Sequence, residues 1–466
     1  MHYEKFADGS VKCIEDKIPF DLPENWAWVR LQSFCTMSNG TAKRNGADGT
    51  HTTVLRLADL GEDDIFYSGT RSVILTDEEI AKYSLSDGDI LFIRVNGSKE
   101  NVGKSYFFEG QPFPVAYCDH LIRCTPSTVL RGKLLSMFMR CGYVRQLIGE
   151  RMVSAAGQNT ISQPSLGTIL LPIPPHHEQD RILQKLTLAE GFIEQLCEAK
   201  HELVKITERA KAKILDLAIH GQLVPQDPAD EPASVLLDRI RKEKENLIKQ
   251  GKIKRDKKET IIFRGDDNSY YRRSPDGLED ITDDLPYDIP DSWEWTSISE
   301  LFSINPRNKI AEDMVVSFIP MPLIDDGYSG CHRSETKEWK SIKTGFSHFQ
   351  NGDIGIAKIT PCFENRKSVI FRDLCNGYGA GTTELHILRP QYRDCVLPEY
   401  ALALLKSERF IQSGVQAFTG AVGQQRIGKD YVMNTYFPLP PYAEQRRIID
   451  RINKLFTLIA TIESAL

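Results

Sequence analysis

FDLPENWAWV, at residues 20–29, returns almost unchanged as YDIPDSWEWT at residues 287–296. A shift of 267 positions superimposes the two strings and the prolines beside them. The matched pairs are Pro19 with Pro286, Asp21 with Asp288, Pro23 with Pro290, Trp26 with Trp293 and Trp28 with Trp295. Alternate residues of a strand point to one face, and prolines stop other structure from running into it. The repeated string therefore predicts a strand whose two indoles pack into a core.

Three further landmarks repeat in the same order and with nearly the same offset. They are SDGDILFIRV (86–95) with QNGDIGIAKI (350–359), GQNTIS (157–162) with GQQRIG (423–428), and LPIPPHHEQDRILQKL (171–186) with FPLPPYAEQRRIIDRI (437–452). The sequence between these landmarks differs greatly between the two halves. We therefore expect two equal frames around different interiors, related by pseudo-two-fold symmetry, which suits a partner that is itself roughly two-fold.

The length and composition indicate an ordinary globular protein with more than one core. A chain of 466 residues exceeds what one hydrophobic core usually organises. Ten cysteines without a CxxC pair fit reduced, buried thiols better than zinc sites or a disulfide framework. The chain starts without a secretory signal and contains no run of about 18 apolar residues, so we expect a cytoplasmic protein that does not enter a membrane. The net charge of −6 implies that any DNA-binding surface is local.

Each half is predicted to be a mixed α/β domain followed by a helix. Short strand-like runs alternate with turn signals, and one helical stretch is predicted at residues 133–149. After each PxPPxxEQ string, apolar residues recur at alternate steps of four and three, from Ile182 to Leu217 and from Ile448 to Leu466. Such seams are typical of helices that pack on each other as a coiled coil.

The predicted fold class is therefore α+β, with two similar α/β globular domains in a pseudo-two-fold arrangement, separated by long antiparallel coiled-coil helices. The predicted bounds are 1–175 for the first domain, 176–221 for the first helix, 222–285 for a linker with a short helix and a basic run, 286–441 for the second domain and 442–466 for the second helix. The basic run is either a solvated segment or a contact for the DNA backbone. Its residues are Lys252, Lys254, Arg255, Lys257 and Lys258. Leu466 aligns with Lys200, so we expect the chain to hold less than two full repeats.

The catalytic motifs that the sequence approaches are incomplete. HHEQDR (176–181) begins like the HExxH zinc helix, but Arg181 replaces the second histidine and the other copy has no histidine at all. LPPY (439–442) lacks the Asp or Asn with which amino-methyltransferases hold a base amino group. Asp325 with ETK at residues 335–337 imitates a nuclease metal site, so a standalone metal-dependent DNA nuclease stays open as the alternative. The motifs as a set favour a binding protein over an enzyme.

The repeated motifs, in this order and in duplicate, resemble the specificity subunit of type I restriction-modification systems. The strings that carry the resemblance are PENWAWVRL and PDSWEWTSI, PIPPHHEQDRI and PLPPYAEQRRI, and AKILDLAIHGQLVPQ at residues 212–226. The resemblance covers essentially the whole chain. It implies that each globular domain is a target recognition domain and reads one half of a bipartite, asymmetric site in double-stranded DNA.

The resemblance also implies partners that carry the chemistry. The helices would dock two modification subunits, which bind S-adenosylmethionine and methylate adenine N6. Up to two restriction subunits would add ATP- and Mg-dependent translocation and cleavage. This chain would bind no cofactor or metal of its own and would be non-catalytic, and its partners would flip the adenine out of the duplex.

Candidate DNA-binding residues are polar or basic residues in predicted turns, since Arg, Asn and Gln side chains must project from loops to reach base edges in the major groove. In the first domain they are Lys43, Arg44, Arg94, Asn96, Ser98, Lys99, Gln158 and Asn159. In the second domain they are Arg307, Asn308, Lys358, Thr360, Arg366, Lys367, Gln424 and Arg426. Each of them could contact a base, a phosphate or water. The candidate partner-binding residues lie on the helical seams and are Ile193, Leu196, Leu203, Ile459 and Ile462.

Overall fold

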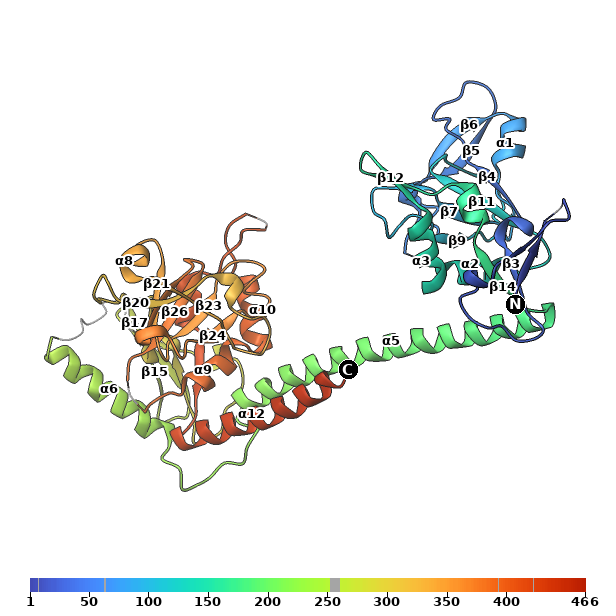
Figure 1. Cartoon of the computed structure of the whole chain (residues 1–466). Coiled ribbons are helices and arrows are strands. Elements are labelled where there is room, and N and C mark those ends of the chain that lie inside the picture. The colour runs from blue at the N-terminus through green and yellow to red at the C-terminus, as the bar shows by residue number, and fades with distance from the viewer. Residues whose placement is uncertain (7, 63, 252–259, 393, 422) are drawn as a thin grey trace. The chain divides into compact units, whose positions relative to one another are not determined.

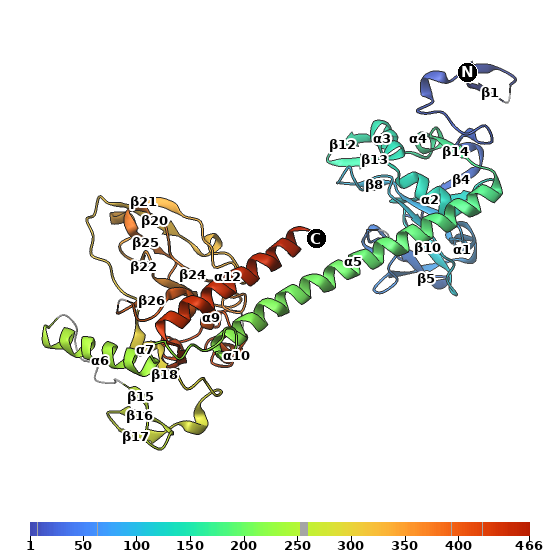
Figure 2. The same ribbon diagram turned by 90° about the horizontal axis from the view of Figure 1, so that it is seen from below.

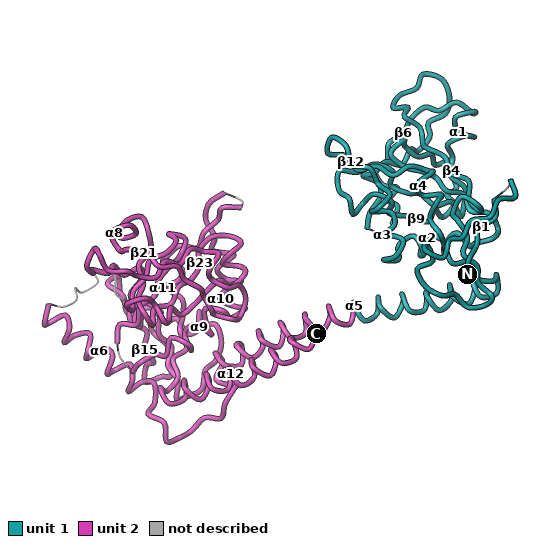
Figure 3. Tube along the Cα trace, viewed as in Figure 1, with its two compact units in different colours: residues 1–196 teal, residues 197–466 magenta. Residues whose placement is uncertain are grey.

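The computed structural model describes residues 1–466 except 7, 63, 252–259, 393 and 422. Figures 1 and 2 show the chain from two sides. It divides into two compact units, Met1–Leu196 and Cys197–Leu466, which Figure 3 colours teal and magenta. Each unit mixes helices and sheets, as predicted from the sequence, and each is described by itself below.

The first unit is built around a four-stranded antiparallel sheet in the order β4-β11-β7-β9. A second sheet has the order β10-β5-β6, with β10 parallel to β5. The bounds of these strands are Cys35–Asn39 (β4), Thr50–Leu55 (β5), Arg71–Leu75 (β6), Ile90–Ile93 (β7), Ser105–Phe107 (β9), Val115–Tyr117 (β10) and Leu121–Pro126 (β11). β7 is buried along its whole length because it lies in the middle of the main sheet.

Smaller sheets and short helices complete the first unit. The pairs are β1 with β2, β3 with β14, and β8 with β13, which also pairs with β12. Their bounds are Tyr3–Lys5 (β1), Val11–Cys13 (β2), Ala27–Arg30 (β3), Val95–Asn96 (β8), Val153–Ala155 (β12), Gln158–Thr160 (β13) and Leu170–Ile173 (β14). The helices are Asp77–Tyr83 (α1), Gly132–Arg140 (α2), Gly142–Arg151 (α3) and Gln163–Gly167 (α4). The sequence predicted one helix where α2 and α3 lie. The chain breaks there because Cys141, which lies between the two helices, is extended and caps the end of α2 and the start of α3.

The second unit repeats the main sheets of this plan. The sheet β19-β26-β23-β24 has the order of β4-β11-β7-β9, β20 pairs with β21 and β25 as β5 pairs with β6 and β10, and β18 pairs with β27 as β3 pairs with β14. The strands are Glu294–Ser297 (β18), Phe302–Ile304 (β19), Val315–Ile319 (β20), Glu335–Glu338 (β21), Ser347–Gln350 (β22), Ile354–Ala357 (β23), Ser368–Ile370 (β24), Tyr378–Gly381 (β25), Leu385–Pro390 (β26) and Tyr436–Leu439 (β27). The helices are Ile298–Leu301 (α7), Trp339–Ile342 (α8), Pro398–Leu405 (α9), Glu408–Gln416 (α10) and Lys429–Asn434 (α11). β22 is an addition, since it extends the sheet of β25.

The segment predicted as a linker is part of the second unit. α6 (Ala233–Lys249) packs Leu236, Leu237 and Ile240 into the main core of that unit. It is followed by a three-stranded sheet, β15 (Ile261–Arg264), β16 (Tyr270–Ser274) and β17 (Gly277–Asp280), which packs on Trp295. The apolar residues of this segment bury enough surface to stabilise a small sheet. The overall composition of the segment did not indicate that sheet. The predicted basic run, 252–258, lies outside the described residues.

Two long helices follow the globular parts. α5 spans His176–Ile219, against a predicted 176–221, and α12 spans Tyr442–Ser464, against a predicted 442–466. Figures 1 and 2 both show α12 beside the C-terminal part of α5. Lys211 Nζ lies 2.6 Å from Glu463 Oε1, whereas Gln226 lies 2.6 Å from Glu444. Residue numbers increase from Lys211 to Gln226 while those of their partners decrease from Glu463 to Glu444, so this part of the chain and α12 run antiparallel. Among the described residues, no helix has the length and apolarity that crossing a membrane requires.

The repeated motifs meet each other in both units. Trp293 Nε1 donates to Glu444 Oε2 at 3.0 Å, and Trp26 Nε1 donates to Glu178 Oε2 at the same distance. The tryptophan comes from the WxW string and the glutamate from PxPPxxEQ, so the bond ties the residue before β3 to α5 and the residue before β18 to α12. Trp293 is fully buried, as the predicted core packing requires, and Trp26 is half-buried.

The glutamine of PxPPxxEQ has an equally fixed role. Gln179 accepts from the backbone N–H of Arg131 at 3.0 Å and donates to the carbonyl oxygens of Val129 and Pro174. Gln445 repeats all three kinds of bond in the second unit, with Leu397, Cys395 and Pro440. Both amides are fully buried, and buried amides need such partners. The duplicated sequence therefore encodes the same set of buried hydrogen bonds in both units.

Candidate nucleic-acid interface

Backbone hydrogen bonds join several of the predicted DNA-binding segments of the first unit. The N–H of Asp119 donates to Thr41 O at 3.0 Å, and the N–H of Arg94 donates to His120 O at 2.8 Å. The N–H of Ile161 then donates to Arg94 O at 3.0 Å. This ladder of bonds places Thr41 and Arg94 beside the turn that contains His120, and Ile161 beside Arg94. Residues that are widely separated in the sequence thus share one edge of the unit.

At this edge, some of the predicted DNA-binding side chains hydrogen-bond to other residues of the protein. Asn159 is 6 % exposed, donates to Gly97 O at 2.9 Å and accepts from Ser154 at 2.6 Å. Asn96 accepts from the N–H of Ser98 at 2.9 Å. These bonds shape the loop and leave little capacity for a base. Lys99 and Gln158 are exposed and make no side-chain hydrogen bond with any described residue, so they are free to contact DNA.

A cavity of about 210 Å³ lies at the same edge and is lined by cations. We call it the basic pocket, and its basic lining residues are Lys43, Arg44, Arg56, Arg71 and His120. Lys43 Nζ lies 2.6 Å from Glu79, and Arg56 binds Asp59 through two nitrogens, at 2.9 and 3.0 Å. Lys43 and Arg44 were predicted as DNA-binding residues. Arg56, Arg71 and His120 were missed, because only the pairing of β5 with β6 and β10 brings them to this place.

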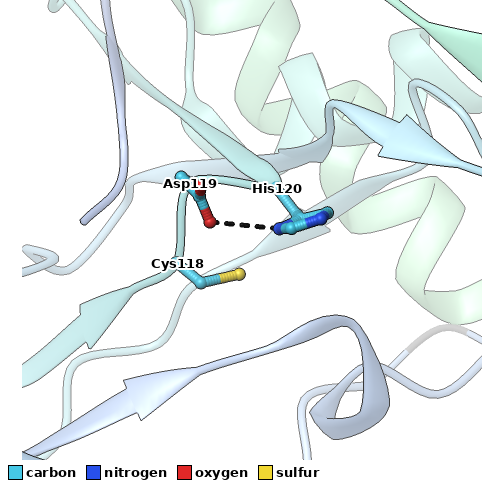
Figure 4. Close-up of side chains that lie close together, drawn as sticks. All are labelled: Cys118, Asp119 and His120. Atoms are coloured by element: carbon cyan, nitrogen blue, oxygen red, sulfur yellow. Dashed lines mark hydrogen bonds and ion pairs between the residues drawn. The ribbon is translucent and has the colours of Figure 1, made fainter. Parts of the chain in front are cut away.

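The turn in the basic pocket also holds the one group of His, Cys, Asp and Glu side chains in the described part of the chain that is close enough to bind a metal ion. Cys118, Asp119 and His120 have ligand atoms within 4.8 Å of one another, and His120 Nδ1 lies 3.1 Å from Asp119 Oδ1 (Figure 4). Burial raises the pKa of the Cys118 thiol, which opposes the thiolate that a metal needs. The surrounding arginines and lysine repel a cation, so the lining suits an anion better.

Two of the three backbone hydrogen bonds at the edge of the first unit have counterparts in the second unit, where other side chains surround them. The N–H of Lys358 donates to Glu384 O at 3.0 Å, and the N–H of Ile427 donates to Lys358 O at 2.9 Å. The N–H of Thr360 donates to Gln425 O at 3.0 Å. The structure therefore brings four predicted residues together, Lys358, Thr360, Gln424 and Arg426. This edge is the counterpart of the one around Arg94.

The charges at the second edge are partly neutralised. Arg426 binds both carboxylate oxygens of Glu384, at 2.9 and 3.0 Å, and this bond lowers the pKa of Glu384. Lys358 and Gln424 make no side-chain hydrogen bond with any described residue. Thr360 Oγ1 is buried and has no partner among the described residues. Lys358 and Gln424 are therefore the freest side chains of this group.

The other four residues predicted in the second unit are held by other segments. Arg307 donates to Phe346 O at 2.9 Å, and Asn308 donates to Phe349 O at 2.8 Å and accepts from Arg389. Arg366 pairs with Glu408 and donates to Lys406 O, while Lys367 lies 2.8 Å from Asp326 and donates to Ile324 O. These polar groups stabilise turns of the unit. A DNA contact by any of them stays a prediction.

Of the five predicted partner-binding residues, three are exposed, one is half-buried and one is buried. Ile193 and Leu196 are 60 % and 69 % exposed, and every residue of α5 from Gln184 to Glu202 is exposed except Gly191. Leu203 is half-buried and Ile462 is exposed. Ile459 is buried, so this residue contributes to the second unit itself rather than to a free surface.

The residues of the alternative nuclease site are not gathered into a group of potential metal ligands in the described part of the chain. Among the described residues, neither Asp325 nor Glu335 belongs to a group of potential metal ligands. Glu335 lies on β21 and is exposed, and Lys337 lies over the ring of Phe318 at 3.7 Å. The geometry at this place is that of a strand surface.

Comparison with known proteins identifies curated relatives. The chain is 45 % identical over 258 residues to the type I restriction enzyme EcoAI specificity subunit of Escherichia coli. It is 42 % identical over 257 residues to the EcoEI specificity subunit of the same species. Each match covers 55 % of this chain and 40 % of the relative, so the chain matches less than half the length of either protein. No protein-family model matches the chain.

Solved structures share the fold. The crystal structure of the HsdS subunit from Thermoanaerobacter tengcongensis matches with a TM-score of 0.55 at 15 % identity, covering 96 % of this chain and 93 % of that one. A structure described as the basis of complex assembly and conformational transition of the type I R-M system matches with a TM-score of 0.56, also at 15 % identity, covering 96 % and 94 %. The curated relatives are thus type I restriction enzyme specificity subunits, and the structural matches are type I restriction-modification structures.

Proposed function

We propose that this chain is the DNA-reading specificity subunit of a type I restriction-modification complex, and that each unit reads one half of a bipartite site. The observation that carries the proposal is the pair of matching ladders, around Arg94 and around Lys358. The backbone frame is the same in both units, while several side chains on it differ, with Arg94, His120 and Thr160 in the first unit where Lys358, Glu384 and Arg426 stand in the second. Two equal frames with different side chains suit two different half-sites, because bases are discriminated by the side chains that reach them.

The free side chains at the two edges are the proposed base readers. They are Lys99 and Gln158 in the first unit and Lys358 and Gln424 in the second. Lysine reads guanine, and glutamine reads adenine through paired hydrogen bonds in the major groove. The predicted residues that are held internally would position the loops that carry these readers.

We further propose that α5 docks modification subunits. The support is the stretch from Gln184 to Glu202, which exposes several large apolar side chains. Leu188, Phe192, Ile193 and Leu196 are each at least 60 % exposed. Clustered apolar side chains on a solvent-exposed surface mark contacts with other proteins. In this proposal methylation belongs to the docked subunits with their S-adenosylmethionine, and any ATP- and Mg-dependent cleavage belongs to restriction subunits.

A domain exchange tests the proposed function. Residues 286–436 are replaced by the corresponding residues of a relative, and the chain is co-expressed with its modification subunits. Single-molecule sequencing of the host genome should show a methylated motif with one half changed and the other half retained. If both halves change together, the two units are not independent readers.

A cleavage assay separates this proposal from the nuclease alternative. The purified chain is incubated with supercoiled plasmid and Mg²⁺, beside a variant carrying Asp325→Asn and Glu335→Gln. The plasmid should stay intact with both proteins. Cleavage that the double substitution abolishes would establish the nuclease instead.

A further inference from the structure

The basic pocket of the first unit holds more positive charge than its own carboxylates neutralise. Lys43 and Arg56 are paired with Glu79 and Asp59. Arg44 and Arg71 also line the cavity, and neither has an ion pair with any described residue, although Arg71 is half-buried. Asp119 is the one carboxylate among the described residues that line the pocket, and it lies beside His120. Two unpaired guanidinium groups at one small cavity are arranged for an anion, since guanidinium groups bind oxyanions through paired hydrogen bonds.

Strand register identifies the equivalent place in the second unit. Tyr117 pairs with Leu55 between parallel strands, and Gly381 pairs with Ile319 in the same way. Val54 likewise pairs with Arg71, and Phe318 pairs with Glu335. Counting from these pairs gives three substitutions at the equivalent place, which are Pro320 for Arg56, Glu335 for Arg71 and Glu384 for His120. The second unit therefore carries proline or glutamate where the first carries Arg56, Arg71 and His120.

We propose that the basic pocket binds a phosphate of the DNA backbone beside the half-site read by the first unit, and that the second unit has no counterpart. The inference rests on the proposed function and adds a positioning contact to it. The pocket adjoins the base-reading edge, because the N–H of Arg94 bonds to His120 O of the pocket turn. Phosphate contacts fix the position of a protein on the duplex, while neighbouring side chains read bases. The first unit would thus hold DNA with a salt-sensitive anchor that the second lacks.

The variant Arg44→Gln with Arg71→Gln tests the pocket in the full chain. Arg181→Gln is the matched control, because Arg181 is an exposed arginine of the same unit outside the pocket. Binding to a short fluorescent DNA duplex of mixed sequence is measured by anisotropy at increasing NaCl concentrations. Loss of one phosphate contact should weaken binding about tenfold and reduce the slope of log K against log salt by about 0.9. The control should keep the slope of the natural chain.

Inorganic phosphate provides a readout that does not depend on DNA. At matched ionic strength, phosphate should raise the thermal midpoint of the natural chain and of Arg181→Gln, and should leave the double variant unchanged. Urea unfolding without phosphate shows whether the double variant is folded, and Arg71→Lys should restore part of the DNA affinity.

The outcomes separate failure of the pocket from failure of the proposed function. An unchanged salt slope in a folded double variant, or an equal change in the Arg181→Gln control, overturns the phosphate anchor while the natural chain still binds DNA. If the natural chain binds no DNA even at low salt, the proposed function itself fails. Protection by inorganic phosphate alone would then assign the pocket to a different anion and overturn the DNA anchor.

Discussion

At the scale of single residues, the bond between the repeated tryptophan and glutamate stabilises each unit to a different degree. Trp293 is fully buried and depends on Glu444, whose pKa is raised by burial even though Trp293 and Gln226 donate to it. Trp26 is half-buried, so water can replace Glu178 if that side chain is removed. A buried donor that loses its partner destabilises the fold by the full desolvation free energy of that group. A donor that water can reach does not, because water replaces the lost partner.

Glu444→Ala should therefore destabilise the second unit by about 1–3 kcal/mol. Glu178→Ala should destabilise the first unit by less than about 1 kcal/mol, because the Trp26 indole N–H can bond to water. Urea unfolding followed by far-UV circular dichroism measures both changes. Equal losses from the two substitutions would show that the exposure of the tryptophan does not decide the cost.

Lys406 provides a second residue-scale prediction, a pH dependence of stability. Its Nζ is buried and donates to the carbonyl oxygens of Gly327 and Arg366, and burial lowers its pKa to about 7. In the unfolded chain the lysine has an ordinary pKa near 10.4. Between these values the unfolded chain binds the proton and the folded chain does not, so stability should increase as the pH rises from about 7.

The expected slope between pH 7 and 9 is up to about 1.4 kcal/mol of unfolding free energy per pH unit. Lys406→Met should remove that slope, and the difference between the two proteins should be measured by urea unfolding at several pH values. Buried tyrosines such as Tyr287 and Tyr431, whose pKa values burial raises, stay protonated in both states below about pH 9. A Met variant with the same slope as the natural chain would show that Lys406 is charged in the fold.

At the scale of elements, α5 changes its environment along its length. From Gln184 to Glu202 it is exposed apart from Gly191, whereas Leu215, Ala218 and Ile219 belong to the main core of the second unit. The regular apolar spacing of α5 thus continues from an exposed stretch of the helix into a buried one. The same substitution should therefore have different consequences at its two ends.

Ile193→Asp with Leu196→Asp should change the stability of the chain alone by less than about 0.5 kcal/mol, because both side chains are exposed. The pair should nevertheless abolish recovery of modification subunits in a pull-down, if these residues form the docking surface. Leu215→Asp is the comparison on the same helix and should destabilise the second unit by several kcal/mol, since it buries a charge. Normal recovery of the partner with the Ile193 and Leu196 double variant would exclude this stretch as the docking surface.

At the scale of the whole molecule, the division into units does not follow the division into helices and domains. The second unit begins at Cys197, within α5, because the end of that helix completes its core. α6 and the sheet β15-β16-β17 belong to the same unit, although their sequence resembles a linker. The unit is therefore larger than the globular domain that the repeat outlines.

A fragment of residues 197–466 should fold with the urea midpoint of the second unit in the whole chain. A fragment that starts at Pro228 should be less stable by several kcal/mol, because Leu215, Ala218 and Ile219 leave the core and expose Ile448 and Ile452. Far-UV circular dichroism in urea compares the two fragments. Equal midpoints would mean that α5 adds nothing to the second unit.

Sequence patterns predict the duplicated frame, the mixed α/β character and the buried tryptophans of the second half. They also located α5 and α12 to within a few residues. These features follow from spacing along the chain, namely alternation in strands, steps of three and four in helices, and proline at helix starts. The duplicated motifs also indicated the relationship to type I specificity subunits, because their order is preserved over both halves.

The tertiary structure alone decided which of the polar residues are free. Asn159, a predicted DNA-binding residue, donates to Gly97 O instead, and Arg426 is neutralised by Glu384. Arg71 joins Arg44 only through the pairing of β5 with β6 and β10. Such contacts join residues that are far apart in the sequence, and local periodicity carries no signal for them. A polar side chain becomes a binding group only when the fold leaves it without an internal partner, and that depends on every strand around it.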